Sequence, residues 1–418
     1  MYSLSGLAMK ELSPKIAPEG SLFGTLPDVC RLLNSDINST RILDSFPEDL
    51  LTRPAIDLDS TQIRVLVQQH SVLVTGAGGS IGSELSRKLA SFKPSRLVLL
   101  DRCENALFEL ERELERREGS HVVALIGDVT DPKRVNAVMT EYPPQIVFHT
   151  AAYKHVPLLE ANPCEAVKNN VTGTRVIAEA AESHGVDRFI LISSDKAVNP
   201  TSVMGATKRV AELLIQKMGK GSRTRFVTVR FGNVLGSSGS VVPQFVQQIK
   251  DGGPLTVTHP EMRRFFMLVP EAVLLVLHAA AAAERGSTYV LEMGEPIRIL
   301  DIARGLAKLA QLKFGKEIAI EYIGPRAGEK LCEELAGANE TLAASGVKNI
   351  LIVQPASEVE STHFLERLRI LEDLASDEKS SAVIFLLQEL VSNFGPSHRL
   401  GLESTVARGQ RADSTDRR

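Results

Sequence analysis

From Val72 onward, short apolar runs alternate with longer segments of helical periodicity, and this alternation limits the fold more than any other feature. The runs are apolar throughout and bounded by Gly, Asp or Ser, which is typical of parallel strands covered on both faces. We therefore predict an α/β fold with a doubly wound parallel sheet. The predicted strands are Val72–Thr75, Arg96–Leu100, Val122–Ile126, Ile146–His149, Phe189–Ser193 and Thr224–Arg230. The predicted helices are Ser83–Ser91, Glu104–Arg117, Glu165–His184 and Ala206–Met218.

The remaining segments do not share this alternation. Residues 1–55 mix prolines with short apolar pieces, and we interpret them as an N-terminal extension, either a small appended unit or partly disordered. Residues 56–235 form the predicted sheet domain. Residues 236–395 are predicted to form a smaller C-terminal substrate-binding lobe, interleaved with that domain, with helices at Ala272–Ala283 and 299–314. Residues 396–418 lack apolar periodicity and are predicted to be a disordered tail.

Composition excludes several classes of protein. The 418 residues carry a net charge of −3, so there is no broad basic surface for nucleic acid or anionic lipid, and a small-molecule partner is the default. The run Ala272–Ala283 is shorter than the ~20 residues of a membrane-spanning helix, and the N-terminus lacks a secretion signal. Four scattered cysteines suggest neither a zinc cluster nor disulfides. We expect a cytoplasmic protein that holds no metal.

The first predicted strand runs directly into a glycine-rich loop and then into a helix. Glycines allow the backbone to approach a pyrophosphate, whose charge is bound by the amide groups at the start of the helix. A tight strand-to-helix turn alone would also use glycine, but the strand before the loop and the helix after it favour a dinucleotide site of Rossmann type. The predicted cofactor contacts are Thr75, Gly76, Gly78, Gly79, Ser80, Ile81 and Gly82.

Three residues at the ends of the next two strands bear on which dinucleotide binds. Asp101 ends the second strand, where a carboxylate could bind both hydroxyls of the adenosine ribose, and this favours NAD. Arg102 could instead bind a 2′-phosphate, so NADP stays open. Asp128 follows the third strand and could accept from the adenine amino group, or it could cap the helix before Pro132.

Charged residues follow the fifth predicted strand, at the edge where open α/β sheets bind their ligands. These residues are Asp195 and Lys196, after Ser194. Further on, Met204 and Lys208 are four residues apart and share one helix face. In the short-chain dehydrogenase pattern the first position of this pair is Tyr, and a thioether cannot replace its proton chemistry. Two non-catalytic interpretations therefore remain. Asp195 and Lys196 could form a surface ion pair, or the chain could be a relative that has lost catalysis.

Seven segments carry a resemblance to a known family. They are Val72–Gly82, His149–Leu158, Asn169–Thr174, Ser193–Pro200, Val203–Arg209, Val229–Gly236 and Gly328–Leu331. They closely resemble the nucleotide-sugar 4,6-dehydratases of the CapD-like polysaccharide biosynthesis group, over roughly residues 50 to 350. The resemblance implies an extended short-chain dehydrogenase/reductase fold, a tightly held nicotinamide cofactor and a UDP-N-acetylhexosamine substrate, typically UDP-N-acetylglucosamine. The departures are Ser194, where Thr is common, and Ala327, where Pro is usual.

The methionine at position 204 distinguishes two branches of that family. Members with Met resemble large membrane-anchored dehydratases that retain the configuration at C5, whereas short members with Tyr typically invert it. The large members carry transmembrane helices and a further nucleotide-binding-like domain. This chain keeps only a short lead, including Leu50–Asp59, that looks like their junction. We therefore expect a soluble, truncated, retaining enzyme that forms a homo-oligomer.

The resemblance also implies chemical roles. Lys196 would be the base at C5 and Asp195 the acid that protonates the departing 6-oxygen, which requires a partly neutral amine and a protonated carboxyl. Side chains in contact would favour both charges instead, whereas neighbours on an extended segment would face opposite ways and could flank the sugar. Ser194 would hydrogen-bond the 4-oxygen, and Lys208 would hold the nicotinamide ribose.

The remaining assignments come from family position. The further cofactor contacts would be Val129, Ala151, Ala152 and Tyr153, with Tyr153 near the nicotinamide. The substrate contacts would be Lys154, Asn170, Asn233, Arg263, Arg264, Arg326, Glu329 and Lys330. Arginines offer fork-shaped donors for phosphate, although a single arginine is more often a solvated side chain. The alternatives to a dehydratase are a nucleotide-sugar 4-epimerase or ketoreductase and a non-catalytic nucleotide-binding protein.

Overall fold

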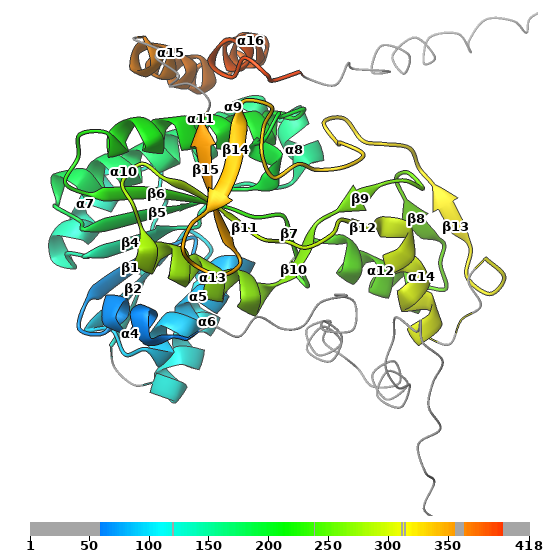
Figure 1. Cartoon of the computed structure of the whole chain (residues 1–418), viewed down its shortest axis with the longest axis horizontal. Coiled ribbons are helices and arrows are strands. Elements are labelled where there is room, and N and C mark those ends of the chain that lie inside the picture. Colours follow the sequence, from blue (N-terminus) through cyan, green and yellow to red (C-terminus); the bar gives the residue numbers. More distant parts are fainter. Residues whose placement is uncertain are drawn as a thin grey trace, which may run out of the picture.

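A nine-stranded sheet lies at the centre of the molecule (Figure 1). The computed structural model describes residues 59–118, 121–237, 239–310, 312, 315–355 and 363–395. The expectations for residues 1–55 and 396–418 lie outside these described residues.

The order of the strands is that of a Rossmann-type fold. Six parallel strands are arranged β3-β2-β1-β4-β5-β6, and β11 extends the parallel set beyond β6. Their bounds are Ser71–Thr75 (β1), Arg96–Asp101 (β2), Val122–Ile126 (β3), Ile146–His149 (β4), Arg188–Ile192 (β5), Arg225–Arg230 (β6) and Thr288–Leu291 (β11). Because β1 is followed by β2 on one side and flanked by β4 on the other, the strand order reverses between β1 and β4. Ligands of open α/β sheets bind at such a switch point.

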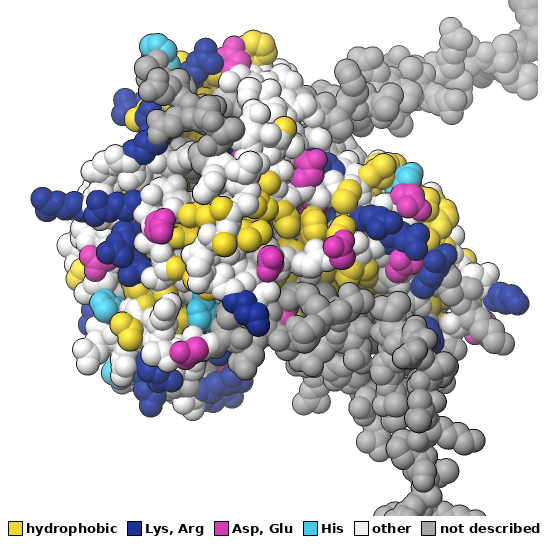
Figure 2. All heavy atoms as spheres, in the orientation of Figure 1, with side chains coloured by type: hydrophobic (Ala, Val, Ile, Leu, Met, Phe, Trp, Pro, Cys, Tyr) yellow, Lys and Arg dark blue, Asp and Glu magenta, His cyan; other side chains and the backbone are white. Residues whose placement is uncertain are grey.

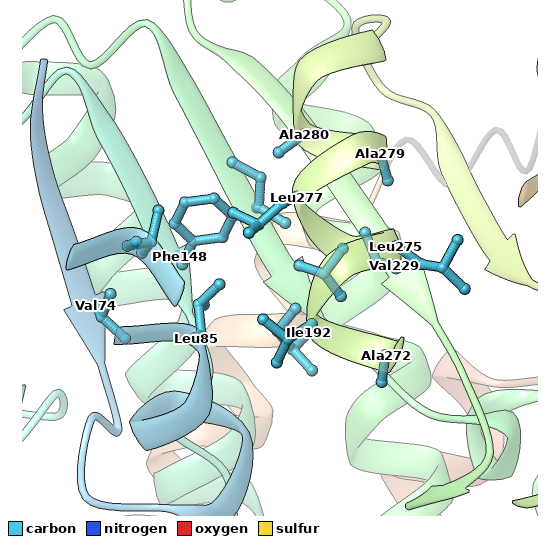
Figure 3. Packing of buried hydrophobic residues seen from close by; sticks show 14 of the residues in the cluster. Val74, Leu85, Phe148, Ile192, Val229, Ala272, Leu275, Leu277, Ala279 and Ala280 are labelled. Carbon is cyan, nitrogen blue, oxygen red and sulfur yellow. The ribbon is translucent and has the colours of Figure 1, made fainter. Parts of the chain in front are cut away.

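Helices cover both faces of the sheet, as the apolar strands predicted. Alternate residues of each strand point to opposite faces, so Val72 and Val74 pack on one side and Leu73 on the other. The first face carries α4 (Thr61–Val67), α5 (Ser80–Ser91), α6 (Glu104–Glu118) and α13 (Val269–Ala282). The second carries α7 (Pro132–Glu141), α10 (Gly173–Ser183) and α11 (Val203–Gly219). Figure 3 shows Leu275 and Leu277 of α13 among residues from the sheet and from α5.

A smaller lobe lies beside the sheet and has an apolar core of its own (Figure 1). It contains α12 (Val241–Lys250), α14 (Ile299–Leu309) and the strand pair β8 (Leu255–Val257) with β13 (Ile320–Tyr322). A second pair joins β9 (Arg263–Arg264) to β12 (Ile297–Arg298). A third, β7 (Asn233–Leu235) with β10 (Phe266–Leu268), connects the lobe to the sheet. Figure 2 shows hydrophobic side chains over α13 and toward these connecting strands.

Two C-terminal helices pack against the second face of the sheet domain. Helices α15 (Phe364–Ser376) and α16 (Ser380–Leu390) share an apolar cluster with α8 (Val156–Ala161), α9 (Pro163–Val167) and α11. The Arg175 guanidinium donates to both carboxylate oxygens of Glu372, at 2.8 and 2.9 Å, and so ties α15 to α10. Helices α15 and α16 are therefore part of the sheet domain, which positions the end of β5.

Several local predictions need correction. The single helix predicted over Glu165–His184 is divided into α9, a π-helical turn at Lys168–Thr172 and α10. The helix predicted over 299–314 ends at Leu309. The sequence analysis also missed the antiparallel strands β14 (Glu340–Ala344) and β15 (Ile350–Pro355), which continue the large sheet beyond β11. The helix expected at Ala272–Ala283 is α13, most of which is buried. Within the described ranges, no helix combines the length and apolarity needed to cross a membrane.

Candidate active site

The glycine-rich loop lies at the switch point, packed against the end of β4. Gly76 has a φ of +68°, and a Cβ there would lie 2.6 Å from backbone atoms of Ala151. A Cβ on Gly82 would lie 2.1 Å from the Gly76 carbonyl oxygen, so the first turn of α5 contacts the loop directly. Gly79 is the N-cap of α5, and no described side chain caps this helix. Ser80 and Ile81 lie in the first turn of this helix, and the amide groups at such a helix start are suited to binding an anion.

Asp101 supports the loop from the end of β2. One carboxylate oxygen accepts from the Gly78 amide at 2.8 Å, and the other accepts from the Cys103 amide at 2.8 Å. A carboxylate has about four lone-pair sites, so both oxygens keep capacity for ribose hydroxyls. Thr75, the last residue of β1, is buried and hydrogen-bonds His149 of β4 at 2.7 Å. The two strands that border the switch point are therefore held in register at their carboxyl ends.

Three predicted cofactor residues meet beyond β2 and β3. The Arg102 guanidinium lies 4.6 Å from the centre of the Tyr153 ring, donates to the Tyr153 hydroxyl and pairs with Asp128 at 3.4 Å. The Tyr153 ring thus packs against Arg102, and its expected position near the nicotinamide stays a prediction. Asp128 does not cap α7, because Asp131 does so by accepting from the first-turn amides. Asp128 instead accepts from Thr130.

The last two predicted cofactor contacts differ in exposure. Val129 is buried in the core of the second face, where a Cβ on Gly173 would lie 2.8 Å from it. Its side chain therefore packs inside the protein, and a cofactor would meet only its backbone. Ala152 is exposed after the end of β4, next to Ala151.

Met204 and Lys208 lie one turn apart on α11 and are both buried. The Lys208 amine donates to the Ile192 carbonyl at the end of β5, at 2.6 Å. Burial lowers the pKa of Lys208 to about 8. Met204 belongs to the apolar cluster that includes α15 and α16, so its side chain contributes packing. Lys208 is thus the polar member of the pair and reaches the carboxyl end of the sheet.

Asp195 and Lys196 are in contact, contrary to the extended arrangement considered from the sequence. They lie in a 3₁₀ turn, Asp195–Ala197, which Ser194 caps by accepting from the Lys196 amide. This turn brings the Lys196 Nζ to 2.9 Å from Asp195 Oδ1. Lys196 also donates to Asn233 Oδ1 at 2.9 Å. The Ser194 hydroxyl donates to Asp195 Oδ1 at 2.9 Å, so in this structure it is not directed at a substrate oxygen.

Glu333 is a neighbour of this pair that the sequence analysis missed. Its Oε1 lies 3.7 Å from the Lys196 Nζ and 3.9 Å from the Arg264 Nε. The residue is 5% exposed. Two adjacent glutamates occupy positions 333 and 334 in an irregular segment, and no period in the sequence indicates which of them turns inward. We call Asp195, Lys196, Arg264 and Glu333 the Asp195 cluster.

The Asp195 cluster contains groups with shifted pKa values and buried oxygen atoms without a described hydrogen-bond partner. Burial lowers the pKa of Lys196, but the charges of Asp195 and Glu333 outweigh burial, so the net pKa is raised. The direction of this shift agrees with the expectation that side chains in contact favour both charges. Burial and the charge of Asp195 raise the pKa of Glu333 against the opposing effect of Lys196 and Arg264. Asp195 Oδ2 and Glu333 Oε2 are buried and have no hydrogen-bond partner in the described part of the chain.

The predicted substrate residues on the lobe side form a connected strip. Arg264 is buried and donates to the carbonyl groups of Arg263 and Lys330, at 2.7 and 2.8 Å. The Lys330 amine donates to the Val198 carbonyl at 2.8 Å and so links this strip to the segment after Lys196. Arg263 itself is exposed. These contacts make Arg264 a residue that holds the backbone around Glu333, rather than a free donor for phosphate.

Four other predicted substrate residues differ in availability. Arg326 is exposed, and its amide donates to Glu329 at 3.1 Å. Lys154 is solvent-accessible after β4, and neighbouring protein atoms lower its pKa by desolvation. Asn170 is a correction, because it is buried and its side chain bonds both the amide and the carbonyl of Tyr153. Asn170 therefore positions the loop after β4 and does not face a substrate.

The strand order, the glycine-rich loop at the switch point and the lysine of α11 at the end of β5 define the class. The protein has the Rossmann-type fold of the extended short-chain dehydrogenase/reductases. The chain belongs to the family of polysaccharide biosynthesis proteins, whose family model matches residues 72–355.

Sequence relatives include proteins named for different activities. The probable polysaccharide biosynthesis protein EpsC of Bacillus subtilis is 49% identical over 76% of this chain and 53% of its own length. A UDP-glucose 4-epimerase of Rickettsia rickettsii is 35% identical over 67% of this chain and 81% of its own length. An inverting UDP-N-acetylglucosamine 4,6-dehydratase of Campylobacter jejuni is 31% identical over 70% of this chain and 84% of its own length. The chain thus spans about half the length of EpsC.

Among solved structures, Pen from Bacillus thuringiensis resembles this chain with a TM-score of 0.64 and 36% identity. The match covers 69% of this chain and 89% of Pen.

Proposed function

We propose that the protein is a nucleotide-sugar 4,6-dehydratase that acts on UDP-N-acetylglucosamine and yields a UDP-4-keto-6-deoxy-N-acetylhexosamine. The observation that carries this proposal is the contact between Lys196 and Asp195 at the end of β5, where the second oxygen of Asp195 is buried and has no hydrogen-bond partner among the described residues. An amine and a carboxyl in contact can remove one proton and supply another. Elimination of water from a sugar requires both.

The residues around the switch point fit a nicotinamide dinucleotide. The uncapped start of α5 and the glycines that leave no Cβ beside it suit a pyrophosphate. Asp101 keeps acceptor capacity for ribose hydroxyls at the end of β2, which favours NAD over NADP. Lys208, buried at the end of β5, would hold the nicotinamide ribose. Bound NAD would supply a hydride acceptor for C4 and a hydride donor for C6.

The side chains of the Asp195 cluster would then act on C5 and C6. Once C4 is a ketone, the hydrogen on C5 is acidic, and the Lys196 amine removes it. Asp195 donates a proton to the 6-oxygen, which leaves as water. The hydride taken from C4 would be added to C6 while Lys196 returns its proton to C5, so the sugar undergoes no net oxidation. The proton released from the 4-hydroxyl balances the one that Asp195 supplies to the departing water. Asn233, which accepts from Lys196, holds the amine in place between these steps.

We further propose that the configuration at C5 is retained. Met204 is packed in an apolar cluster and carries no proton, so the face opposite Lys196 receives no proton donor from this position. A single amine that removes and returns the proton leaves C5 unchanged. Proton NMR of the first-formed product should therefore show the xylo configuration, and an arabino product would contradict retention.

A 4-epimerase is the second candidate, because several relatives carry that name. Epimerases of this fold normally use a tyrosine where this chain has Met204. An epimerase would also return hydride to C4 and would need no acid for the 6-oxygen. The Asp195 carboxyl therefore favours the dehydratase.

One assay separates these candidates. Purified protein is incubated with UDP-N-acetylglucosamine, and the 4-keto product is followed by its chromophore in alkali and by mass spectrometry. A dehydratase gives loss of one water, an epimerase gives UDP-N-acetylgalactosamine, and a non-catalytic binding protein gives neither. Lys196→Met is the matched variant. In deuterated water it should bind substrate but incorporate no deuterium at C5, and normal turnover by this variant would refute the role of Lys196.

A further inference from the structure

The Asp195 cluster poses a conflict that two residues alone do not resolve. Lys196 and Asp195 are in contact, and contact favours an ammonium beside a carboxylate. The proposed reaction needs the opposite pair, a neutral amine and a protonated acid. A third group that changes the balance of charge around Lys196 would resolve the conflict, and Glu333 is the buried group in position to do so.

We propose that Glu333 is a positioning residue that carries a proton in the active form of the enzyme and thereby allows Lys196 to become the base. The inference rests on the proposed dehydratase function. It assigns Glu333 an action through Lys196 and not on the substrate itself.

Distances around Lys196 support this role. The amine lies 2.9 Å from Asp195 Oδ1 and 3.7 Å from Glu333 Oε1, so two carboxyl groups flank one amine. When both carboxyls are ionised, two negative charges hold the ammonium. When Glu333 is protonated, only Asp195 opposes loss of the proton. The proton can then move from Lys196 Nζ to Asp195 Oδ1, which leaves a neutral amine and a neutral acid while Glu333 keeps its own proton.

The positive groups that face Glu333 only weakly offset the negative charge of its ionised carboxylate. Asp195 and Lys196 approach it from the 3₁₀ turn, Arg264 approaches from β9, and Lys330 lies on its own segment. Arg264 uses its NH1 group on backbone carbonyls, and its Nε lies 3.9 Å from Glu333 Oε1, beyond hydrogen-bond distance. Burial raises the pKa of the Glu333 carboxyl, with the charge of Asp195 acting in the same direction. Burial, the distance to Arg264 and the neighbouring Asp195 carboxyl thus all favour the protonated form of this group.

A second observation points the same way. Glu333 Oε2 and Asp195 Oδ2 are both buried without a hydrogen-bond partner in the described structure. Two ionised carboxylates, each with an unsatisfied buried oxygen, would be costly. A proton on Glu333 removes one of the two charges and reduces that cost. The pair thus favours a state in which one carboxyl is neutral.

The test compares Glu333→Gln, which resembles the protonated form, with Glu334→Gln as the matched control. Glu334 is the adjacent residue, its side chain is 51% exposed, and it pairs with Lys330 and Asn199 instead of Lys196. The first readout is the pKa of Lys196, from ¹³C NMR of lysine-labelled full-length protein assigned with Lys196→Met. In Glu333→Gln this pKa should fall by about 1 unit or more. In Glu334→Gln it should not change.

The second readout is the pH dependence of kcat with UDP-N-acetylglucosamine. Because Lys196 acts when neutral, a lower pKa moves the rising limb of the profile to lower pH, with turnover retained in Glu333→Gln. An unchanged Lys196 pKa would overturn the proposal. So would a folded, substrate-binding Glu333→Gln that turns over at no pH, because Glu333 would then itself exchange a proton with the substrate.

The two proposals fail in different ways. If the wild-type protein makes no keto sugar, the dehydratase function fails, yet the NMR comparison still decides whether Glu333 controls Lys196. If Glu333→Gln does not fold, Glu333→Met removes the same charge with similar volume, and buried charged groups often tolerate such apolar replacement. The same fall in the Lys196 pKa is expected for it.

Discussion

Two buried clusters of charge lie on neighbouring parts of this molecule and differ in how completely they are satisfied. In the Arg230 network, formed by Glu212, Arg230 and Glu340, the guanidinium of Arg230 donates to all four carboxylate oxygens at 2.7–3.0 Å. Ser193 and Arg209 add further donors to Glu212. In the Asp195 cluster, by contrast, two carboxylate oxygens are buried without a described partner.

The difference shows how the same residue types serve the fold in one place and chemistry in the other. The Arg230 network connects β6, α11 and β14, and its pairing lowers the pKa of Glu340 to about 2 despite partial burial. In the Asp195 cluster, burial keeps the pKa of Glu333 raised. A satisfied network fixes protonation states, whereas an unsatisfied one leaves protons able to move.

The largest effect is expected on turnover from Asp195→Asn. An amide cannot deliver a proton to the 6-oxygen, so kcat should fall by about 10²–10⁴-fold. Asn keeps an oxygen that can accept from Ser194 and Lys196, so the free energy of unfolding should fall by less than the cost of breaking a buried pair, about 3–5 kcal/mol. Steady-state kinetics and urea unfolding measure both quantities. A large loss of stability with little loss of turnover would mean that Asp195 stabilises the fold and does not act in the reaction.

The next largest effect is expected from Arg230→Met. This change leaves Glu212 and Glu340 without their shared partner, and breaking a buried pair costs about 3–5 kcal/mol. Arg209→Met is the matched control, since Arg209 reaches the same two carboxylates from a more exposed site and should cost about 1 kcal/mol. Equal costs in urea unfolding would mean that Arg230 is not the centre of the network.

Acid should weaken the Arg230 network in a defined range. The folded pKa of Glu340 is about 2, against an ordinary value of 4.5, so its stabilisation is present above about pH 5 and is lost as pH falls toward 2. The shift corresponds to about 3 kcal/mol. The difference in unfolding free energy between wild type and Glu340→Gln should shrink across this range. A difference that does not depend on pH would contradict the assignment.

The smallest effect is expected from a substitution that changes no charged or hydrogen-bonding group. Met204→Leu conserves volume within an apolar cluster and should cost less than about 1.5 kcal/mol. The C5 configuration of the product should not change, because the side chain carries no proton. Thermal unfolding and NMR of the product check the two parts. A change of configuration would show that the thioether acts on the substrate.

Much of the sheet and its glycine-rich loop could be predicted, because those features depend on local periodicity. The run of residues 72–82 alone indicates strand, turn and helix, and the structure places Gly76 and Gly82 where a Cβ would collide with backbone. Strands β14 and β15 escaped prediction because they return to the sheet after a long excursion through the lobe. Their pairing depends on tertiary contacts, which no short window of sequence reveals.

The site was predictable in its parts but not in its contacts. The residues after β5 could be named from their position at the end of a strand, yet the 3₁₀ turn that brings Lys196 onto Asp195 was not foreseen. Glu333 comes from an irregular segment distant in sequence, and only the fold brings it within 3.7 Å of Lys196. Asn170 shows the converse, since the side chain of a predicted substrate residue is buried and hydrogen-bonds Tyr153, Thr207 and Asn169.

The most direct test of the account follows the hydride. UDP-N-acetylglucosamine that carries deuterium at C4 is converted by the wild-type protein, and the product is analysed by mass spectrometry and deuterium NMR. If the protein catalyses dehydration by internal oxidation and reduction, the deuterium will appear in the new methyl group at C6. A keto product whose methyl group contains no deuterium would contradict the account.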